Sequence, residues 1–197
     1  MQLTEQVIVE PFIRAAVAGD SGVITEIYNH YVAKTVITFE EEPVSAPEMT
    51  RRIEEVGSAS LPWLVAEREG TIVGYAYATP WRARSAYRFS VEVTVYVDPD
   101  CPRLGIGRRL YEELLPILKA RGAHAAFGVI ALPNEASVAL HERFGFIKVA
   151  HLREVGFKFD RWIDVGYWQL ILESSRGRIV SLNSSAPPHP QVRVVRS

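Results

Sequence analysis

Apolar positions along the chain follow two spacings, one typical of strands and one typical of helices. In residues 89–97, valine occupies every second position, which predicts a strand with one buried face. In residues 105–121, apolar side chains recur every four positions, and Gly122 follows as a common helix end. The same patterns predict further strands at 7–14, 63–68, 71–79, 123–130, 147–159 and 161–172, and further helices at 20–33, 47–56 and 134–144. This order predicts an α/β (α+β) fold built on a mixed, twisted sheet with helices on both faces.

The C-terminal segment differs from the rest of the chain. Residues 174–197 are rich in Ser, Arg and Pro and show no apolar periodicity, so we expect a flexible tail there. A chain of 197 residues is long enough for one well-buried core and too short for two ordinary domains. We therefore expect one domain at 7–173, followed by the tail.

Charge and cysteine content restrict the partners and the location. The chain has 22 Lys and Arg against 23 Asp and Glu, a net charge of -1, which gives no general attraction to nucleic acid or to an anionic membrane. No apolar run approaches the roughly 18 residues of a membrane span, and no secretion signal is visible. The single cysteine, Cys101, allows no internal disulfide and favours a reducing cytoplasm. We expect neither a nucleic-acid nor a membrane partner, and no metal.

The loop between the strand at 89–97 and the helix that follows contains two glycines. Gly105 and Gly107 let the backbone approach a ligand closely, and N–H groups at a helix start favour phosphates. Arg108 follows where a P-loop has Lys, and Leu110 stands where a dinucleotide-binding loop has its third glycine. The residues alone leave two interpretations open, an anion-binding loop and an ordinary turn before a helix.

Several other residues are ambiguous when judged from the pattern alone. Glu92 lies in a strongly β-branched strand and shares a face with Thr94 and Tyr96, which fits either a functional carboxylate or a solvated one. Arg82 and Arg84 alternate with apolar residues and could bind a carboxylate together, or belong to a solvated basic loop.

The loop and the segment that begins at residue 132 carry a family resemblance. Residues 102–107 read Pro-Arg-Leu-Gly-Ile-Gly and follow the pattern Gln/Arg-x-x-Gly-x-Gly/Ala, with a departure at Pro102. Residues 132–146 resemble the fourth helix of the same family, the GNAT superfamily of acetyltransferases. Segments spread from Ile13 to Leu172 are similar to its phosphinothricin N-acetyltransferase branch, and they include 29–31, 62–67, 78–87, 92–97, 156–158 and 162–166.

The resemblance implies a fold, a cosubstrate and a binding site for it. The fold would be a mixed, mostly antiparallel twisted sheet with a splayed central strand pair. The cosubstrate would be acetyl-CoA, with its pantetheine arm along one strand, its pyrophosphate on the loop and a further contact from the fourth helix. The residues implied at this site are Val95, Tyr96, Val97, Arg103, Leu104, Gly105, Ile106, Gly107, Arg108 and Asn134.

The resemblance also implies catalytic and substrate-binding residues. Glu92 takes the place of the proposed base that deprotonates the amine, directly or through water. His141 takes the place that faces the thiol, where the superfamily usually has Tyr; without the resemblance it reads as a packed or capping residue. The substrate-binding residues would be Phe39, Arg82, Arg84 and Tyr87.

These implications give one preferred function and two alternatives. The preferred function is direct acetyl transfer from acetyl-CoA to the α-amine of phosphinothricin or a similar small anionic amino acid. The first alternative changes the acceptor to methionine sulfoximine, methionine sulfone, another amine or a protein N-terminus. The second is a non-catalytic acyl-CoA-binding sensor. The resemblance further implies a small-molecule, amino-acid-like substrate and a homodimer.

Overall fold

The computed structural model describes residues 10–101 and 104–172. The predicted order of strands and helices is confirmed. The outer bounds expected for the domain, 7 and 173, and the expected tail at 174–197 lie outside the described residues. The elements are β1 (Phe12–Ala15), α1 (Ser21–Lys34), α2 (Ala46–Ser58), β2 (Trp63–Arg68), β3 (Thr71–Pro80), β4 (Ser90–Val97), α3 (Ile106–Ala120), β5 (Ala125–Leu132), α4 (Glu135–Arg143), β6 (Ile147–Lys158) and β7 (Arg161–Ile171), with short 3-10 turns at Ala18–Asp20 and Ser85–Tyr87.

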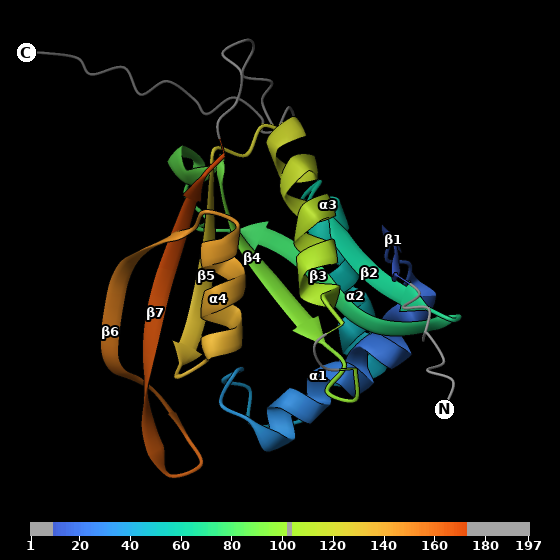
Figure 1. Cartoon of the computed structure of the whole chain (residues 1–197), viewed down its shortest axis with the longest axis horizontal. Coiled ribbons are helices and arrows are strands. Elements are labelled where there is room, and N and C mark those ends of the chain that lie inside the picture. Colours follow the sequence, from blue (N-terminus) through green and yellow to red (C-terminus); the bar gives the residue numbers. More distant parts are fainter. Residues whose placement is uncertain (1–9, 102–103, 173–197) are drawn as a thin grey trace, which may run out of the picture.

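The strands form one sheet in the order β1-β2-β3-β4-β5-β7-β6. All neighbouring pairs are antiparallel except β4 and β5, which are parallel. These two strands pair only where Ser90, Val91 and Glu92 face residues 125–127, and beyond that point they separate (Figure 1). The expected mostly antiparallel sheet with a splayed central pair is therefore confirmed.

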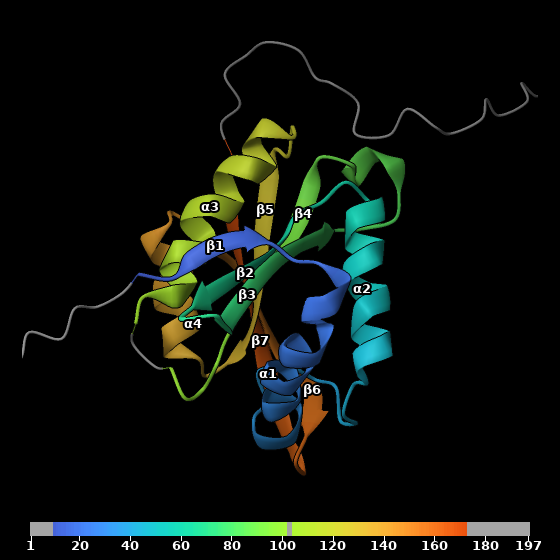
Figure 2. The same ribbon diagram turned by 90° about the vertical axis from the view of Figure 1, so that its right-hand side faces the viewer.

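Helices cover the sheet on both sides. α1 and α2 lie on one face, and α3 and α4 lie on the other (Figure 2). The apolar residues that recur every four positions in α3 form its buried face, since Leu110, Leu114 and Leu118 are each 0% exposed. The helix approaches the sheet closely at Gly74, where a Cβ atom would stand 2.9 Å from the Ile106 side chain. This close packing places the start of α3 directly against β3 and β4.

The helix starts that border the splayed strands are set by local sequence. α4 begins where the Asn134 side chain accepts a hydrogen bond of 3.1 Å from the Ser137 N–H, which satisfies one of the free donors of the first turn. α3 begins after Gly105, which has a left-handed backbone with φ of 69°. A residue with a Cβ atom would be strained in that conformation. Both helix starts point toward the gap between β4 and β5.

The sheet half formed by β5, β7 and β6 is covered less completely. α4 packs on β5 from one face, whereas α1 and α2 contact β2, β3 and β4 on the other. Large apolar side chains consequently remain exposed on β6, on β7 and at the turn between them. They are Ile147, Val149, Leu152, Val155, Phe157, Phe159, Trp162 and Ile171.

Candidate active site

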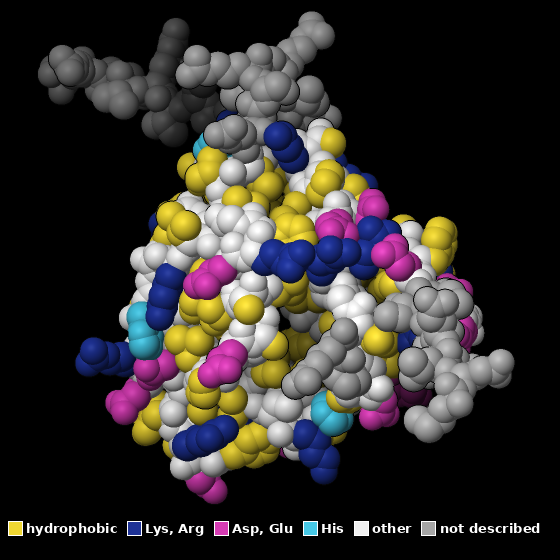
Figure 3. Space-filling model, in the orientation of Figure 1, with side chains coloured by type: hydrophobic (Ala, Val, Ile, Leu, Met, Phe, Trp, Pro, Cys, Tyr) yellow, Lys and Arg dark blue, Asp and Glu magenta, His cyan; other side chains and the backbone are white. Residues whose placement is uncertain are grey.

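A cavity of about 680 Å³ lies where β4 and β5 separate, between the start of α3 and α4. Figure 3 shows the hollow on the face of the molecule that carries these two helices. Arg103, which sequence analysis also assigned to the cosubstrate, lies outside the described residues. The other residues assigned to the cosubstrate all line this cavity: Val95, Tyr96, Val97, Leu104, Gly105, Ile106, Gly107, Arg108 and Asn134.

The loop at the start of α3 fits an anionic group. The first α-helical bond joins the Arg109 N–H to the Gly105 carbonyl at 3.0 Å, and the N–H groups of the preceding helical residues have no partner within the helix. Gly107 is tightly packed, because a Cβ atom there would stand 3.2 Å from the Leu140 side chain. Arg108 adds a cation to the cavity lining while its Nε lies 3.5 Å from Glu112. Helix N–H groups and a guanidinium around a cavity are the chemistry that binds phosphates.

The free edge of β4 offers a second recognition element. Beyond Glu92, the side of β4 that faces β5 has no strand partner, and the backbone from Val93 to Val97 lines the cavity instead. The Tyr31 hydroxyl donates a hydrogen bond of 2.5 Å to the Val97 carbonyl, which fixes the end of the strand. An extended ligand with amide groups would pair with this edge as an added strand.

Glu92 stands at the point where β4 and β5 separate. It lies opposite Thr79 on β3 and beside Phe127 on β5, and it is half-buried. Burial raises the pKa of the Glu92 carboxyl above its ordinary value. Glu92 makes no ion pair with any residue in the described ranges. The carboxylate is therefore available to accept a proton from a molecule bound beside it.

Tyr77 shares the Glu92 face of the sheet and was missed by sequence analysis. It pairs with Thr94, two positions from Glu92, and stacks on Trp63 with ring centroids 4.1 Å apart. Burial raises the pKa of Tyr77 to about 12, so its hydroxyl stays protonated at neutral pH. The alternating tyrosines of β3 are visible in the sequence, but the sequence does not show that β3 pairs with β4 and so brings Tyr77 near Glu92.

An aromatic wall borders Glu92 on the same face. Trp81 stacks on Phe127 with ring centroids 4.4 Å apart and meets the edge of Tyr167 at 5.7 Å. The guanidinium carbon of Arg82 lies 5.4 Å from the Trp81 ring. Phe127 and Tyr167 were also missed, because they meet Trp81 only through the pairing of β4, β5 and β7.

The remaining substrate candidates lie farther from this wall. Arg84 and Tyr87 are exposed at the 3-10 turn after β3. Phe39 lies in the segment between α1 and α2, and its ring packs against Gly156 of β6. Neither Phe39 nor these two residues line the cavity between β4 and β5. The structure thus brings Arg82, but not Arg84 or Tyr87, against the aromatic wall.

His141 approaches the cavity from the opposite face. It is 3% exposed, and a Cβ atom on Gly128 would stand 2.3 Å from its ring. Because Phe127 points to the Glu92 side, its neighbour Gly128 points to the α4 side. Glu92 and His141 therefore lie on opposite faces of the sheet, on either side of the gap.

Both ring nitrogens of His141 have partners. Nδ1 lies 2.8 Å from the Ser137 carbonyl and Nε2 lies 3.1 Å from the Tyr111 hydroxyl. A carbonyl only accepts, so Nδ1 carries the proton and Nε2 accepts from Tyr111. Burial lowers the pKa of His141, which favours this neutral form. Tyr111, which is 0% exposed, is another residue that sequence analysis missed.

The family model described as an acetyltransferase (GNAT) domain matches residues 13–166, most of the chain. The chain belongs to the GNAT acetyltransferases. Among similar proteins is the phosphinothricin N-acetyltransferase of Streptomyces viridochromogenes, 42% identical over 178 residues, which cover 90% of this chain and 91% of that protein. The L-methionine sulfoximine/L-methionine sulfone acetyltransferase of Salmonella typhimurium is 36% identical, over 82% of this chain and 94% of that protein.

This GNAT acetyltransferase is also similar to a solved structure that contains bound cosubstrate. It is a phosphinothricin acetyltransferase from Sinorhizobium meliloti in complex with AcCoA, with a TM-score of 0.83 and 37% identity over 87% of this chain and 94% of that chain. The predicted family, fold and acyltransferase class are confirmed. In the part of the chain that the structure describes, no helix of the GNAT acetyltransferase has the length and apolar character of a membrane span.

Proposed function

We propose that this acetyltransferase transfers the acetyl group of acetyl-CoA directly to the α-amine of phosphinothricin or a similar small anionic amino acid. The observation that carries the proposal is the half-buried Glu92 carboxylate, which has no ion-pair partner in the described ranges. It lies where β4 and β5 separate, next to Val93, which lines the cavity. The similarity to phosphinothricin N-acetyltransferase supports the choice of acceptor.

We assign acetyl-CoA to this cavity because the residues that line it can bind a phosphate group and an extended amide chain. Gly105 and Gly107 would let the backbone approach the pyrophosphate, and Arg108 would add charge beside it. The free edge of β4 would pair with the pantetheine amides. This arrangement directs the thioester toward Glu92, where the two strands begin to separate.

Glu92 would remove a proton from the ammonium of the acceptor, directly or through one water. The neutral amine then attacks the thioester carbonyl, the new C–N bond forms, and the C–S bond breaks. A backbone N–H near Val95 would stabilise the oxyanion that forms during attack. His141 lies on the side of the leaving thiolate, and Tyr111 holds its Nε2. The attacking nitrogen loses its second proton as the amide forms, and this proton would pass to the thiolate as it leaves.

Direct transfer is supported by the state of Cys101. This cysteine lines the same cavity, and burial together with nearby Asp98 raises the pKa of its thiol. An activated nucleophile would need the opposite shift, so Cys101 is poorly suited to carry an acetyl group. A lone free thiol also suits the reducing cytoplasm that we propose as its location.

Arg82 and Arg84 would supply the donors for the anionic groups of the acceptor. A guanidinium forms two parallel hydrogen bonds with a carboxylate or phosphinate. Trp81 and Phe127 would contact the rest of the acceptor side chain. Methionine sulfoximine or methionine sulfone is the second candidate, supported by the similarity to an acetyltransferase for these compounds.

We further propose that the chain forms a homodimer. The exposed apolar side chains of β6, β7 and the turn between them include Trp162, 61% exposed, and Phe157, 50% exposed, with ring centroids 5.0 Å apart. A second copy would remove these side chains from water. Light scattering during gel filtration tests the proposal, and the mass of a monomer at micromolar concentration would contradict it.

The test of the proposed function is thiol release from acetyl-CoA with four acceptors: phosphinothricin, methionine sulfoximine, methionine sulfone and a generic peptide. Glu92→Gln should lower kcat/KM by about 10²- to 10⁴-fold, as expected for loss of a general base. Exposed Glu26 of α1 provides the matched control, and Glu26→Gln should change nothing. Binding of acetyl-CoA without turnover of any acceptor would favour the non-catalytic sensor.

A further inference from the structure

Lys158, the last residue of β6, is a buried lysine that the reaction does not use. It is 2% exposed, and its Nζ donates a hydrogen bond of 2.9 Å to the backbone carbonyl of Thr38. Lysine is rarely buried to this extent unless a partner compensates the charge. Within the described residues Lys158 makes no salt bridge, although Glu40 and Glu41 are near enough to raise its pKa while burial lowers it more. The Thr38 carbonyl is thus the main partner of a buried ammonium group.

The segment that contains Thr38 connects α1 to α2, and we call residues 35–45 the α1–α2 loop. Its start packs on the far half of the sheet, since Val36 forms a small buried cluster with Ala131 of β5 and Ile163 of β7. The Thr38 hydroxyl lies 2.8 Å from the Tyr28 hydroxyl of α1. The loop is therefore attached through its side chains both to α1 and to β5 and β7.

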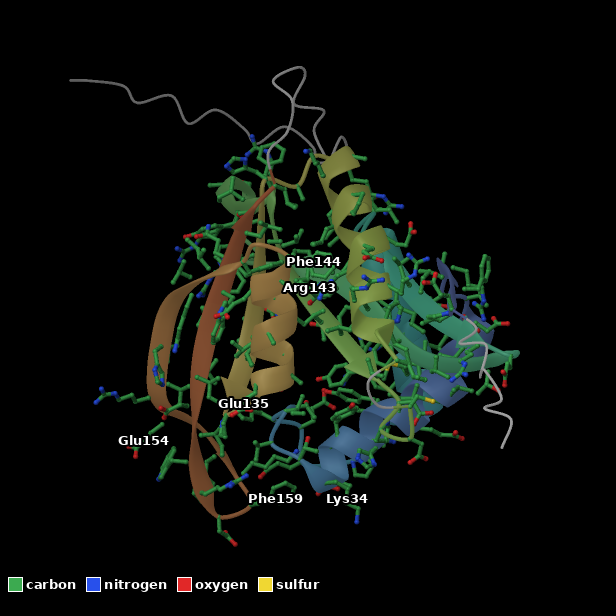
Figure 4. All side chains as sticks on the ribbon, in the orientation of Figure 1. Lys34, Glu135, Arg143, Phe144, Glu154 and Phe159 are labelled. Carbon is green, nitrogen blue, oxygen red and sulfur yellow. The ribbon has the colours of Figure 1, made fainter. Side chains whose placement is uncertain are left out.

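β6 and β7 form a hairpin that receives the other side of this loop. Gly156 and Lys158 are two positions apart on β6, so they point to the same face of the strand. A Cβ atom on Gly156 would stand 2.3 Å from the Phe39 ring, so only glycine leaves room for that ring. In Figure 4, Phe159 marks the turn of the hairpin and Lys34 marks the end of α1, at the same end of the molecule. Two consecutive residues of the loop, Thr38 and Phe39, are thus held by one face of the hairpin.

The position of the loop affects the cavity on the side that we assign to the acceptor. Ile37 lines the cavity and is 38% exposed, one position before Thr38. Tyr28 of α1 packs on Tyr96, which points to the same face of β4 as Glu92, whereas Gly107 packs against Leu140 of α4 on the other face. A shift of the α1–α2 loop would consequently change the space beside Glu92 and leave the phosphate-binding loop in place.

We propose that Lys158 is a positioning residue for the acceptor. Its hydrogen bond to Thr38 fastens the α1–α2 loop to the β6–β7 hairpin, so that Ile37 stays at the cavity while the Phe39 ring stays against Gly156. The statement about the acceptor rests on the function proposed above, but the fastening of the loop does not. A bond between a buried ammonium and a carbonyl is stronger than a neutral one, which suits a contact that must hold a loop in one place.

The main test replaces Lys158 by methionine, which keeps the length of the side chain and removes the ammonium group. In Lys158→Met, the KM for phosphinothricin should rise about 10- to 100-fold, the range expected for loss of a hydrogen bond to a charged group. kcat should change less than about threefold, and the Kd for acetyl-CoA should stay unchanged. The matched control is Lys148→Met, a change at an exposed lysine of the same strand, which should have none of these effects.

Hydrogen–deuterium exchange supplies a readout that needs no acceptor. Residues 35–41 should exchange faster in Lys158→Met than in the wild-type chain or in Lys148→Met. Gly156→Ala perturbs a second contact between β6 and the α1–α2 loop, because it displaces the Phe39 ring, and it should give the same rise in the acceptor KM.

The possible outcomes separate the two proposals. Unchanged exchange of residues 35–41 in a folded Lys158→Met protein would refute the fastening. Faster exchange with an unchanged acceptor KM, or an equal loss of acetyl-CoA affinity, would refute the role in positioning the acceptor. If the wild-type enzyme acetylates no acceptor, the proposed function fails, and the exchange measurement alone decides whether Lys158 holds the loop.

Discussion

Gly128 of β5 is the position where the smallest change should have a large effect on stability. In Gly128→Ala, the added Cβ atom would stand 2.3 Å from both Cδ2 and Nε2 of His141. An ordinary contact begins at 3.4 Å, so the ring has to move by at least about 1.1 Å. The strand cannot retreat easily, because Gly128 is paired with Trp168 of β7 and the residue before it, Phe127, is paired with both β4 and β7.

The magnitude follows from what holds the ring. Overpacking of a buried site costs about 1 to 3 kcal/mol. A movement of this size also breaks at least one of the hydrogen bonds of His141, to Ser137 or to Tyr111, and an unpaired buried group costs about 1 to 3 kcal/mol more. We therefore expect Gly128→Ala to reduce the free energy of unfolding by about 2 to 6 kcal/mol. For a chain of this length, Tm should fall by at least about 4 °C.

Urea unfolding followed by tryptophan fluorescence measures this change. The control is the same substitution in the helix α2, at Gly57, where a Cβ atom would meet nothing within 4 Å. Gly57→Ala should be neutral or stabilise by up to about 1 kcal/mol, because alanine favours the helix. A Gly128→Ala protein that unfolds within about 0.5 kcal/mol of the wild type would refute the packing of His141 against β5.

Four further predictions concern residues of the proposed active site. Because burial raises the pKa of Glu92 and the base is the carboxylate, kcat/KM should fall, as pH decreases, at a higher pH than for an ordinary glutamate. The Glu92 carboxyl binds its proton more tightly in the folded chain than in the unfolded chain, so the ionised carboxylate lowers stability above the raised pKa and this cost disappears at lower pH. At pH 7.5, Glu92→Gln should therefore unfold at a Tm no lower than that of the wild type. A clear decrease in Tm would contradict this. Tyr111→Phe leaves Nε2 of His141 without its donor and should cost about 1 to 3 kcal/mol in urea unfolding; a Tyr111→Phe protein as stable as wild type would show that the hydrogen bond is absent. Arg82→Ala should raise the KM for phosphinothricin by about tenfold and leave the KM for its α-carboxamide nearly unchanged, whereas an equal rise for both compounds would exclude contact with the carboxylate.

The sequence by itself determined the order of the elements and the cavity loop. Strand and helix periods depend on residues a few positions apart, and the helix ends depend on single residues such as Asn134 and Gly122. The loop of Gly105 and Gly107 is one continuous segment, so its residues were certain to lie together at the start of α3. Its assignment to the cosubstrate came from the resemblance to the GNAT superfamily, because the loop residues alone also fit an ordinary turn before a helix.

Only the tertiary structure decided which distant residues meet. Trp81 stacks on Phe127 because β4 and β5 pair in parallel, and the periodicity of either strand is the same with any partner. The same pairing places Glu92 and His141 on opposite sides of the gap, which no pattern within one segment could show. Lys158 reads as a polar residue at a strand end, and its burial depends on a loop 120 residues earlier in the chain. Local spacing specifies the elements, but sheet order and the burial of long side chains result from packing between segments that are far apart in sequence.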